Sequence, residues 1–507
     1  MNKLAKMLTD DKKASWKVVK YNGVELGANG TKTSDVGAMY MLANVTDYEQ
    51  LKARLPYIRN YKLAQQQMSP GFFQYAATGE YPGESGFMAE RGNWIEPLFT
   101  TYYTMLDVGN MSLFTPDDAE LKNRLRLAAD KLLAWQHADG SFDVAYDRIS
   151  NLSSFSQLSD VRPTWYGFVV AARVLGDEKY LAAAKKGADW YLKNAVKKGH
   201  YLGACGDALN IWDFTTVFGS QALLDLYDLT HDEKYKSAAI EVAQVYATTI
   251  FTHPIPTNNP KTVAGKTLAD WEFTQVGLSV EHIRGTANSG PILLSSHCGL
   301  FVRMYEMTHD QIFLDMARAA ARGRQHFTDL DTGMSVYYWN AVDKVDKVVN
   351  LFPWHAEWQV GWITDYLISE AHLRSDGNIN FPHGFPTPKV GSHVSYGFAS
   401  GVIYGKPASL WSGKSAVQSD NPDSEYLSAI SSDHKTMFVI VLNQKSADQQ
   451  VTLKIDRNQS AYGQPLKWSS AKALAGAIDS SNLDTGTITV KMPAWGIAVV
   501  SLDLQSK

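Results

Sequence analysis

The apolar positions of this chain alternate between two patterns over its first three quarters. Segments such as TWYGFVVAARVL (164–175) are apolar on nearly every face, which is typical of helices buried on all sides. Segments such as YLAAAKKGADWYLKNAV (180–196) carry apolar residues on one face and charged residues on the other, as partly exposed helices do. The alternation predicts inner helices, each followed by an outer helix.

A short polar turn joins each inner helix to its outer helix, and the sequence of this turn repeats. It reads YDLTHDEKY at 227–235, YEMTHDQIF at 305–313 and, in a shortened form, RVLGDEKY at 173–180. Threonine and aspartate in these turns supply side-chain oxygens that cap the helix that follows. A helix pair that recurs in this way indicates a repeat architecture. The helix pairs that we expect span residues 34–68, 91–137, 160–196, 207–250 and 289–327.

A sixth inner helix is expected at 354–373, and residues 2–20 are the candidate for its outer partner. Six inner helices ringed by outer helices make an (α/α)6 toroid. An open helical solenoid is the alternative, because it also stacks repeated helix pairs. We assign the toroid to residues 1–376, with residues 251–288 as an insertion.

The pattern changes after residue 376. Residues 377–420 are rich in proline and glycine and are expected to cross the molecule as an irregular segment. Residues 421–507 contain short alternating runs such as TMFVIVLNQ, separated by Asn, Asp, Gly and Ser, which predict a small antiparallel β-sandwich. The expected fold class is therefore mainly α with a C-terminal β domain, and we give that domain a structural role.

Composition narrows the class of protein. A net charge of −4 over 507 residues argues against nucleic-acid binding. The sequence contains no run of about 18 apolar residues, which a membrane span would need. The first residues lack the apolar core of a signal peptide, so we expect a cytoplasmic protein, or a periplasmic one if a leader was removed. Cys205 and Cys298 give neither a disulfide framework nor zinc spacing. The 14 Trp, 25 Tyr and 20 Phe suit stacking on sugar rings, although large cores also use aromatics.

The N-termini of the inner helices should meet at one mouth of a toroid, because alternating hairpins make all inner helices run in the same direction. Most of these ends carry a tryptophan beside carboxylates, whereas the opposite ends carry the repeated polar turns. Converging helix N-termini favour bound anions, and arginines add bidentate recognition of a carboxylate. We therefore expect the mouth to bind a uronic acid stacked on indoles. The residues expected to bind this substrate are Arg91, Trp94, Glu96, Asp160, Arg162, Trp165, Tyr166, Trp212, His297, Trp354, His355 and Trp358.

Hydrolysis of a glycosidic bond needs two carboxyl groups, one as a protonated acid and one as a base or nucleophile. Glu357 suits the acid because it lies between Trp354 and Trp358 in FPWHAEWQVGW, and burial among indoles raises a carboxyl pKa. The expected opposing base is Asp207 or Asp213, with Glu90 in reserve.

Other interpretations of these residues stay open. Arg91 and Arg162 could instead form salt bridges to the carboxylates beside them in the sequence, at positions 90 and 160. His297 and His355 are either satisfied core residues or a pair that exchanges protons at a sugar carbon, as in a sugar epimerase or a uronate-specific polysaccharide lyase. A glycan-binding toroid is the non-enzyme alternative. With no metal cluster or cofactor motif evident, we expect no metal, no cofactor, a carbohydrate partner and a monomer or homo-oligomer.

Several of these motifs resemble those of a known group of enzymes. ERGNWIEPLF, VRPTWYGF, NIWDFTTVFG and FPWHAEWQVGW, together with PHGFPTPKVG and the C-terminal sandwich, resemble six-hairpin carbohydrate-active enzymes, and among these glycoside hydrolase family 154. The resemblance covers residues 34–410 and implies an exo-acting β-glucuronidase on a plant or host glycan. HAEWQVGW is also similar to the His-plus-Glu helix of N-acylglucosamine 2-epimerases, which lack a C-terminal sandwich.

Overall fold

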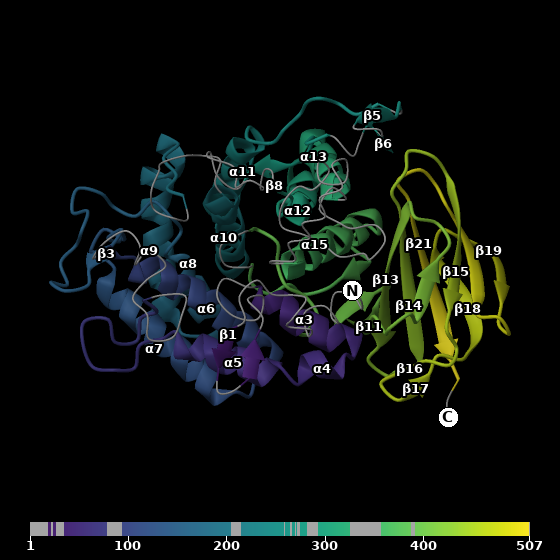
Figure 1. The fold of residues 1–507 in the computed structure, drawn as a ribbon, viewed down its shortest axis with the longest axis horizontal. Coiled ribbons are helices and arrows are strands. Elements are labelled where there is room, and N and C mark those ends of the chain that lie inside the picture. Colours follow the sequence, from purple (N-terminus) through teal and green to yellow (C-terminus); the bar gives the residue numbers. More distant parts are fainter. Residues whose placement is uncertain are drawn as a thin grey trace.

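The computed structural model is mostly helical up to residue 374 and rich in β-strands beyond it (Figure 1). The expected class, mainly α with a β-rich C-terminal region, is therefore confirmed. Among the described residues, no helix has the length and apolar character needed to cross a bilayer. The structure describes residues 19–21, 24–26, 35–78, 94–203, 214–257, 259–263, 266–268, 270, 274–280, 293–324, 356–386 and 391–505.

The apolar segments form the inner helices of the described chain. Nearly every residue of α3 and most residues of α6 and α10 are buried, as their apolar sequences predict. The inner helices are α3 (Val36–Thr46), α6 (Pro97–Phe114), α8 (Tyr166–Leu175), α10 (Phe214–Thr230), α12 (Cys298–Thr308) and α15 (Ala356–Arg374).

The amphipathic segments form the outer helices. Asp118, Asp177, Asp232 and Asp310 each precede one of these helices, and each carboxylate accepts a hydrogen bond from a backbone N–H of the first turn. The predicted capping by the repeated turns is therefore confirmed. The outer helices are α5 (Leu55–Ala64), which follows the short α4 (Glu49–Lys52), α7 (Ala119–Trp135), α9 (Glu178–Asn194), α11 (Glu233–Ala247) and α13 (Gln311–Gly323).

Neighbouring inner helices pack side by side in chain order. Helix α3 contacts α6, α6 contacts α8, α8 contacts α10, and α12 contacts α15, which in turn contacts α3. Between α12 and α10, Arg303 Nη2 donates a hydrogen bond to Gln221 Oε1 at 3.0 Å. These contacts run around a ring, with α7, α9, α11 and α13 each packed on the inner helix before it. The full (α/α)6 toroid stays a prediction, because residues 2–18 lie outside the described residues.

Short paired strands and one 3-10 helix lie between the helices. Strand β3, just before α6, pairs with β4, and β8, just before α12, pairs with β7. Each pair therefore connects the residues that precede an inner helix to another loop. These elements are β1 (Val19–Tyr21), β2 (Val24–Leu26), β3 (Trp94–Ile95), β4 (Tyr146–Asp147), η3 (Val196–Lys198), β5 (Lys261–Val263), β6 (Lys266–Leu268), β7 (Ser279–Val280) and β8 (Leu293–Leu294).

Two antiparallel sheets make up the β-rich region, in the orders β18-β21-β14-β13-β11-β10-β9 and β12-β15-β20-β19. Alternate residues of β14 belong to different cores, because Phe438 and Ile440 pack with the helices while Val439 and Val441 pack within the β-rich region. The strands are β9 (Ile379–Asn380), β10 (Gly401–Ile403), β11 (Lys406–Leu410), β12 (Val417–Ser419), β13 (Ser424–Ser431), β14 (Thr436–Asn443), β15 (Gln449–Ile455), β16 (Ser460–Ala461), β17 (Gln464–Pro465), β18 (Trp468–Ala475), β19 (Ala477–Asn482), β20 (Thr487–Met492) and β21 (Ile497–Leu504).

Residues 377–420, which we expected to be irregular, contribute β9, β10 and β11 to the larger sheet and β12 to the smaller one. The sheets therefore begin before residue 421. The helices and the larger sheet are joined at α15, where Arg374 Nη1 donates to the backbone oxygen of Asn443 at 2.8 Å. Figure 1 shows the β-rich region beside α15 and α3.

The segment that follows β9 lies inside the ring of inner helices. Asn110 of α6 forms two hydrogen bonds with the backbone of Phe385, at 3.1 and 2.9 Å. Arg173 of α8 lies over the ring of Phe385, 4.9 Å from its centroid. Tyr396 donates to Asp365 Oδ1 of α15 at 2.8 Å. Because these contacts come from three inner helices, the segment occupies the interior next to the C-terminal halves of α6 and α8. It also reaches two helix starts, since His393 Nε2 lies 2.6 Å from Asp35 Oδ2 at the start of α3, and Ser392 Oγ donates to the backbone oxygen of Ser296, just before α12, at 3.3 Å.

Candidate active site

A buried ion cluster joins the N-terminal ends of α6 and α8. Arg162, four residues before α8, donates from Nη1 to Glu96 Oε1 at 2.7 Å and from Nε to Asp160 Oδ1 at 2.8 Å. A further bond from Nη2 to Asp160 Oδ2, at 3.0 Å, makes the second pair bidentate. The guanidinium also lies over the ring of Phe99, 4.5 Å from its centroid. The cluster therefore fixes two neighbouring helix ends relative to each other.

The first two turns of α6, α8 and α10 converge on Phe218 of α10. The ring centroids of Tyr102, Tyr103 and Tyr166 lie 6.3, 6.0 and 5.5 Å from that of Phe218. The hydroxyl of Tyr166 donates to Asp225, whose pKa is raised by burial. Aromatic side chains from three helices thus form one wall at this end of the ring.

Buried polar atoms without a hydrogen-bond partner in the described chain gather at the starts of the inner helices. Buried polar groups are normally hydrogen-bonded, so such a group of exceptions marks a place where water or a ligand completes the bonds. Four inner helices contribute, α8, α10, α12 and α15, each from its first two turns or the residues just before it. The atoms are Trp165 Nε1, Thr216 Oγ1, Ser296 Oγ, His297 Nδ1 and Trp362 Nε1.

The structure brings some of the predicted site residues together and separates others. Glu96, Asp160 and Arg162 form the ion cluster. Arg162 therefore makes the salt bridge to Asp160 that was the alternative to substrate binding, and it pairs with Glu96 as well. Trp165 packs away from this cluster, against Gly187 and Tyr191 of the outer helix α9.

Three further predicted residues are buried: Tyr166 in α8, His297 just before α12 and Trp358 in α15. Buried indoles such as Trp165 and Trp358 form part of the core rather than an open stacking surface. The predicted residues Glu90, Arg91, Asp207, Trp212, Asp213, Trp354 and His355 lie outside the described residues, as do the side chains of Trp94 and Glu357.

Tyr102, Thr216 and Trp362 are candidate site residues that sequence reasoning did not select. Tyr102 and Thr216 lie in apolar helices that read as uniform core, so only their polar atoms set them apart. Trp362 had a usable signal, because it continues the i, i+4 spacing of Trp354 and Trp358.

A second polar network lies deeper in the ring. Arg303 donates to Asp365 Oδ1 at 2.6 Å, and Gln221 Nε2 donates to Asp225 Oδ1 at 2.7 Å. Within the described chain, Asp225, Asp228 and His383 could hold a cation, since their ligand atoms lie within 4.8 Å of one another. The Asp225 carboxylate, however, already accepts bonds from Tyr166 and Gln221. Both oxygens of Asp225 are therefore already engaged by side chains of the protein.

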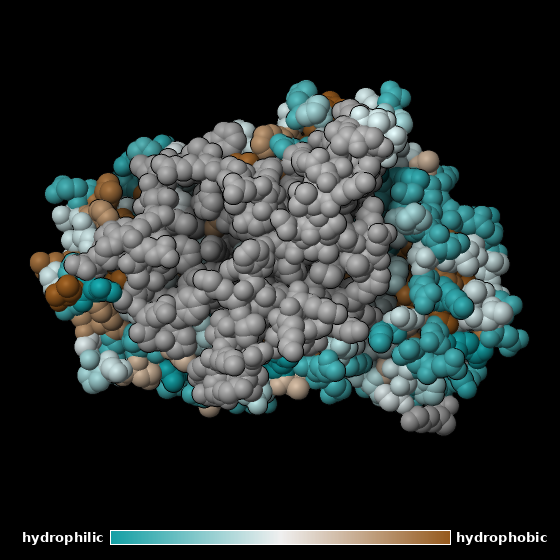
Figure 2. All heavy atoms as spheres, viewed as in Figure 1, coloured by the Kyte–Doolittle hydropathy of each residue, from teal (hydrophilic) through white to brown (hydrophobic). Residues whose placement is uncertain are grey.

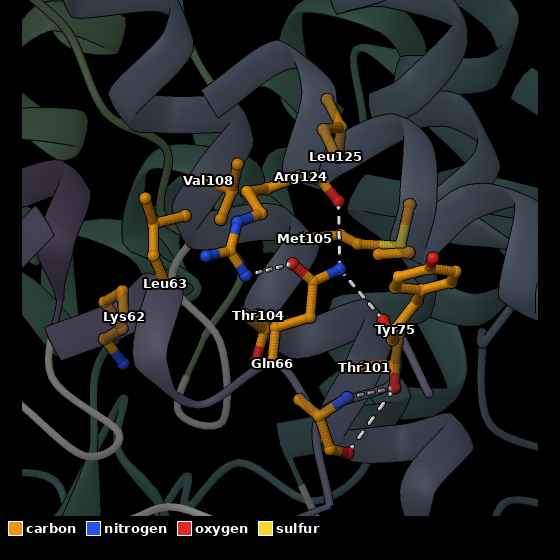
Figure 3. A pocket seen from close by; sticks show the side chains of 12 residues that line it. Lys62, Leu63, Gln66, Tyr75, Thr101, Thr104, Met105, Val108, Arg124 and Leu125 are labelled. Atoms are coloured by element: carbon orange, nitrogen blue, oxygen red, sulfur yellow. Dashed lines mark hydrogen bonds between the residues drawn. The ribbon is translucent and has the colours of Figure 1, made fainter. Parts of the chain in front are cut away.

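Figure 3 shows a separate small cavity between α5, α6 and α7. Gln66 crosses it, donating from Nε2 to the backbone oxygens of Tyr75 at 2.9 Å and Arg124 at 3.0 Å. The cavity has a volume of about 10 Å³, which is close to the smallest volume that holds one water molecule. This cavity cannot admit a sugar, and the mouth of the ring remains the candidate site.

Comparison with known proteins gives structural matches only: no protein-family model and no curated protein matches the sequence. A cellobiose 2-epimerase from Bacillus thermoamylovorans is 13% identical over 67% of this chain and 87% of its own, with a TM-score of 0.43. A GH76 α-mannanase from Bacteroides thetaiotaomicron is 13% identical over 71% and 96%, with a TM-score of 0.41. An unsaturated glucuronyl hydrolase specific for heparin is 12% identical over 72% and 94%, with a TM-score of 0.42. By name, these structural neighbours are carbohydrate-processing enzymes.

His297 is a buried neutral base at the start of α12. Its Nε2 lies 3.0 Å from the backbone oxygen of Gly277, and a carbonyl oxygen only accepts, so Nε2 carries the proton. Nδ1 is then the unprotonated nitrogen, and it has no hydrogen-bond partner in the described chain. Burial lowers the pKa of His297 to about 4.

Acid should therefore destabilise the protein through His297. The folded-state pKa of about 4 lies below the 6.5 that is usual for histidine, so the contribution is present above pH 6.5 and is lost as the pH falls towards 4. At pH 5 the loss should be about 2 kcal/mol. Urea unfolding of His297→Asn at pH 7 and pH 5 should show a smaller loss between the two pH values than the wild type does. The exposed control His200→Asn should keep the wild-type pH response, and an equal response in His297→Asn would contradict the assignment.

Proposed function

We propose that this protein is an exo-acting glycoside hydrolase that removes a terminal uronic acid, with β-linked glucuronate as the expected substrate. The supporting observation is the set of unpartnered buried hydroxyl, indole and imidazole groups at the starts of α10, α12 and α15. A sugar presents many hydroxyl groups in a small volume, and such a set of donors and acceptors suits it. The positive ends of converging helix dipoles favour a substrate that also carries a carboxylate.

The catalytic roles that we propose follow from the starts of α15 and α10. Helix α15 begins at Ala356, so Glu357 is its second residue and Trp358, which is buried, comes next. We propose Glu357 as the acid because it lies between Trp354 and Trp358 in the sequence, and burial among indoles raises a carboxyl pKa. Asp213 comes directly before α10, and Asp207 lies six residues earlier. One of these two aspartates is the proposed base or nucleophile, and Glu90 is the reserve.

Product analysis tests the reaction class. The protein is incubated with an aryl β-glucuronide, the matching aryl β-glucoside and a small panel of uronate-containing oligosaccharides. Hydrolysis releases free glucuronate from the glucuronide, with little turnover of the glucoside, which lacks the carboxylate. An unsaturated sugar that absorbs in the far ultraviolet would instead identify a lyase. Binding without any product would leave a glycan-binding protein.

A sugar epimerase is the second candidate, and His297 favours it. An epimerase must remove a proton from a carbon atom, and Nδ1 of His297 is an unprotonated nitrogen, although its ring packs 5.7 Å from that of Tyr246 on the outer helix α11. Incubation of free sugars in D2O distinguishes the two reactions. An epimerase incorporates deuterium at the inverted carbon, whereas a hydrolase leaves the carbon-bound hydrogens of its product unexchanged.

A further inference from the structure

A polar cavity of about 520 Å³ lies in the β-rich region, where β15 ends and the β16–β17 hairpin follows. Its walls come from β12, from the turn after β15 and from the turn between β19 and β20. This volume falls in the range of about 300–1,000 Å³ that small-molecule sites occupy. The polar side chains that matter below are those of Gln418, Lys454, Arg457, Asn458, Lys467 and Thr485.

Positive charge dominates the lining of this β-region cavity. Three cationic side chains, Lys454, Arg457 and Lys467, outnumber its two carboxylates, and within the described chain none of the three forms an ion pair. The carboxylate of Asp456 already accepts a hydrogen bond from the backbone N–H of Asn458, at 2.9 Å. With Asp456 and Asp484 counted, the lining keeps an excess of one positive charge, and none of its three cations is held by an ion pair in the described chain.

Arg457 is held in place while most of its donors stay available. Its guanidinium lies 5.7 Å from the centroid of the buried indole of Trp468. One donor, Nη1, reaches the backbone oxygen of Asp484 at 3.4 Å, and the buried Nε has no hydrogen-bond partner. Because Nε has no accessible surface, a ligand in the cavity cannot reach it; within the described chain Nη2 forms no hydrogen bond and is the donor that remains for an anion.

The frame around these cations is rigid. Gln418 and Lys454 are cross-strand partners in the β12–β15 pair. The backbone N–H of Ile455 donates to the oxygen of Gly486 at 2.8 Å, which ties the end of β15 to the β19–β20 turn. The backbone around the cavity is therefore fixed, whereas the exposed side chains of Lys454 and Lys467 become ordered only when a ligand binds.

We propose that the β-region cavity binds an acidic sugar unit of a glycan chain. Lys454, Arg457 and Lys467 hold its carboxylate or sulfate group, and Gln418 and Asn458 bond to its hydroxyl groups. A small inorganic anion would leave most of the cavity empty and would not use the amide side chains. The choice of a sugar rests on the proposed function, whereas the preference for an anion rests on the cavity. The face of the β-rich region seen in Figure 2 is mostly hydrophilic, which suits a hydrated glycan.

Affinity electrophoresis of the full chain tests this site without measuring catalysis. Native gels contain hyaluronan, which carries carboxylates, dextran sulfate, which carries sulfates, or neutral dextran. We expect one or both acidic polymers to retard the protein, and dextran to leave it unretarded. The double variant Lys454→Gln/Lys467→Gln and the single variant Arg457→Gln should each bind the retarding polymer at least about tenfold more weakly, because each loses charge-assisted hydrogen bonds.

The double variant Lys435→Gln/Lys472→Gln is the matched control, since it removes the same charge from exposed positions of the β-rich region outside the cavity. It should bind within about twofold of the wild type, because exposed distant charges are screened. The inference is overturned if neither acidic polymer retards the wild type, or if control and cavity variants weaken equally. Release of glucuronate by variants that no longer bind polymer would support both proposals, whereas polymer binding without hydrolysis would remove only the proposed function.

Discussion

Replacing Arg162 by methionine should lower the free energy of unfolding by about 3–5 kcal/mol. The reason is the environment that the guanidinium leaves behind. Its side chain is fully buried, and those of Glu96 and Asp160 are 2% and 0% exposed. Without the cation, two carboxylates would stay enclosed near each other and would lose their hydrogen bonds to the guanidinium. Both would have to take up protons or draw water into the interface between the starts of α6 and α8.

Urea unfolding at pH 7, followed by far-ultraviolet circular dichroism, measures this loss. The matched control is Lys491→Met, which breaks an exposed ion pair with Asp479 and should cost less than about 1 kcal/mol. Adding Glu96→Gln and Asp160→Asn to Arg162→Met should recover part of the stability, because the uncompensated charges are then gone. A cost for Arg162→Met no larger than that of the control would show that the cluster is not enclosed as described.

The helical part of the fold was predictable because its signals are local. The spacing of apolar residues within about four turns predicts a helix, and an aspartate a few residues away predicts where the helix begins. Asp232 and Asp310 lie in turns that the repeated sequence identified, and both cap the helices that follow. The same local logic separated inner from outer helices, since burial on all sides requires an apolar sequence on all sides.

The strands between residues 377 and 420 were missed because their signals are not local. Strand β11 reads KPASL, without a β-branched or aromatic residue, and it contains Pro407. Proline within a run normally argues against a central strand. Strand β11 nevertheless lies between β10 and β13, so pairing partners supplied by the rest of the chain determine its conformation.

The site divides in a similar way. Sequence reasoning placed the chemistry at the starts of the inner helices, and the unpartnered polar atoms lie there too. It could not decide which side of a helix start faces the ring, so Trp165 was expected to bind sugar although it packs on α9. Nor could it choose between ligand and salt bridge for Arg162, because Glu96, one of its two partners, lies 66 residues away.

Glu357→Gln and Asp207→Asn should each lower kcat on a glucuronate-terminated oligosaccharide by about 10²–10⁴-fold, as the loss of a general acid or base does. The two variants should differ on substrates with a good leaving group. An aryl glucuronide needs little protonation of its leaving oxygen, so Glu357→Gln should retain far more activity on it than on the oligosaccharide. Asp207→Asn should lose activity on both, because attack at the sugar carbon is impaired whatever leaves.

Steady-state kinetics on both substrates, with Glu241→Gln on the exposed face of α11 as the matched control, measures this difference. The control should keep wild-type kcat, because its carboxylate lies on an outer helix far from the mouth of the ring. Loss of the alkaline limb of the pH–rate profile in Glu357→Gln would support its role as the acid. If Asp207→Asn is active and Asp213→Asn is not, the base is Asp213. Full turnover by Glu357→Gln together with both aspartate variants would show that other carboxylates, Glu90 first among them, carry the reaction.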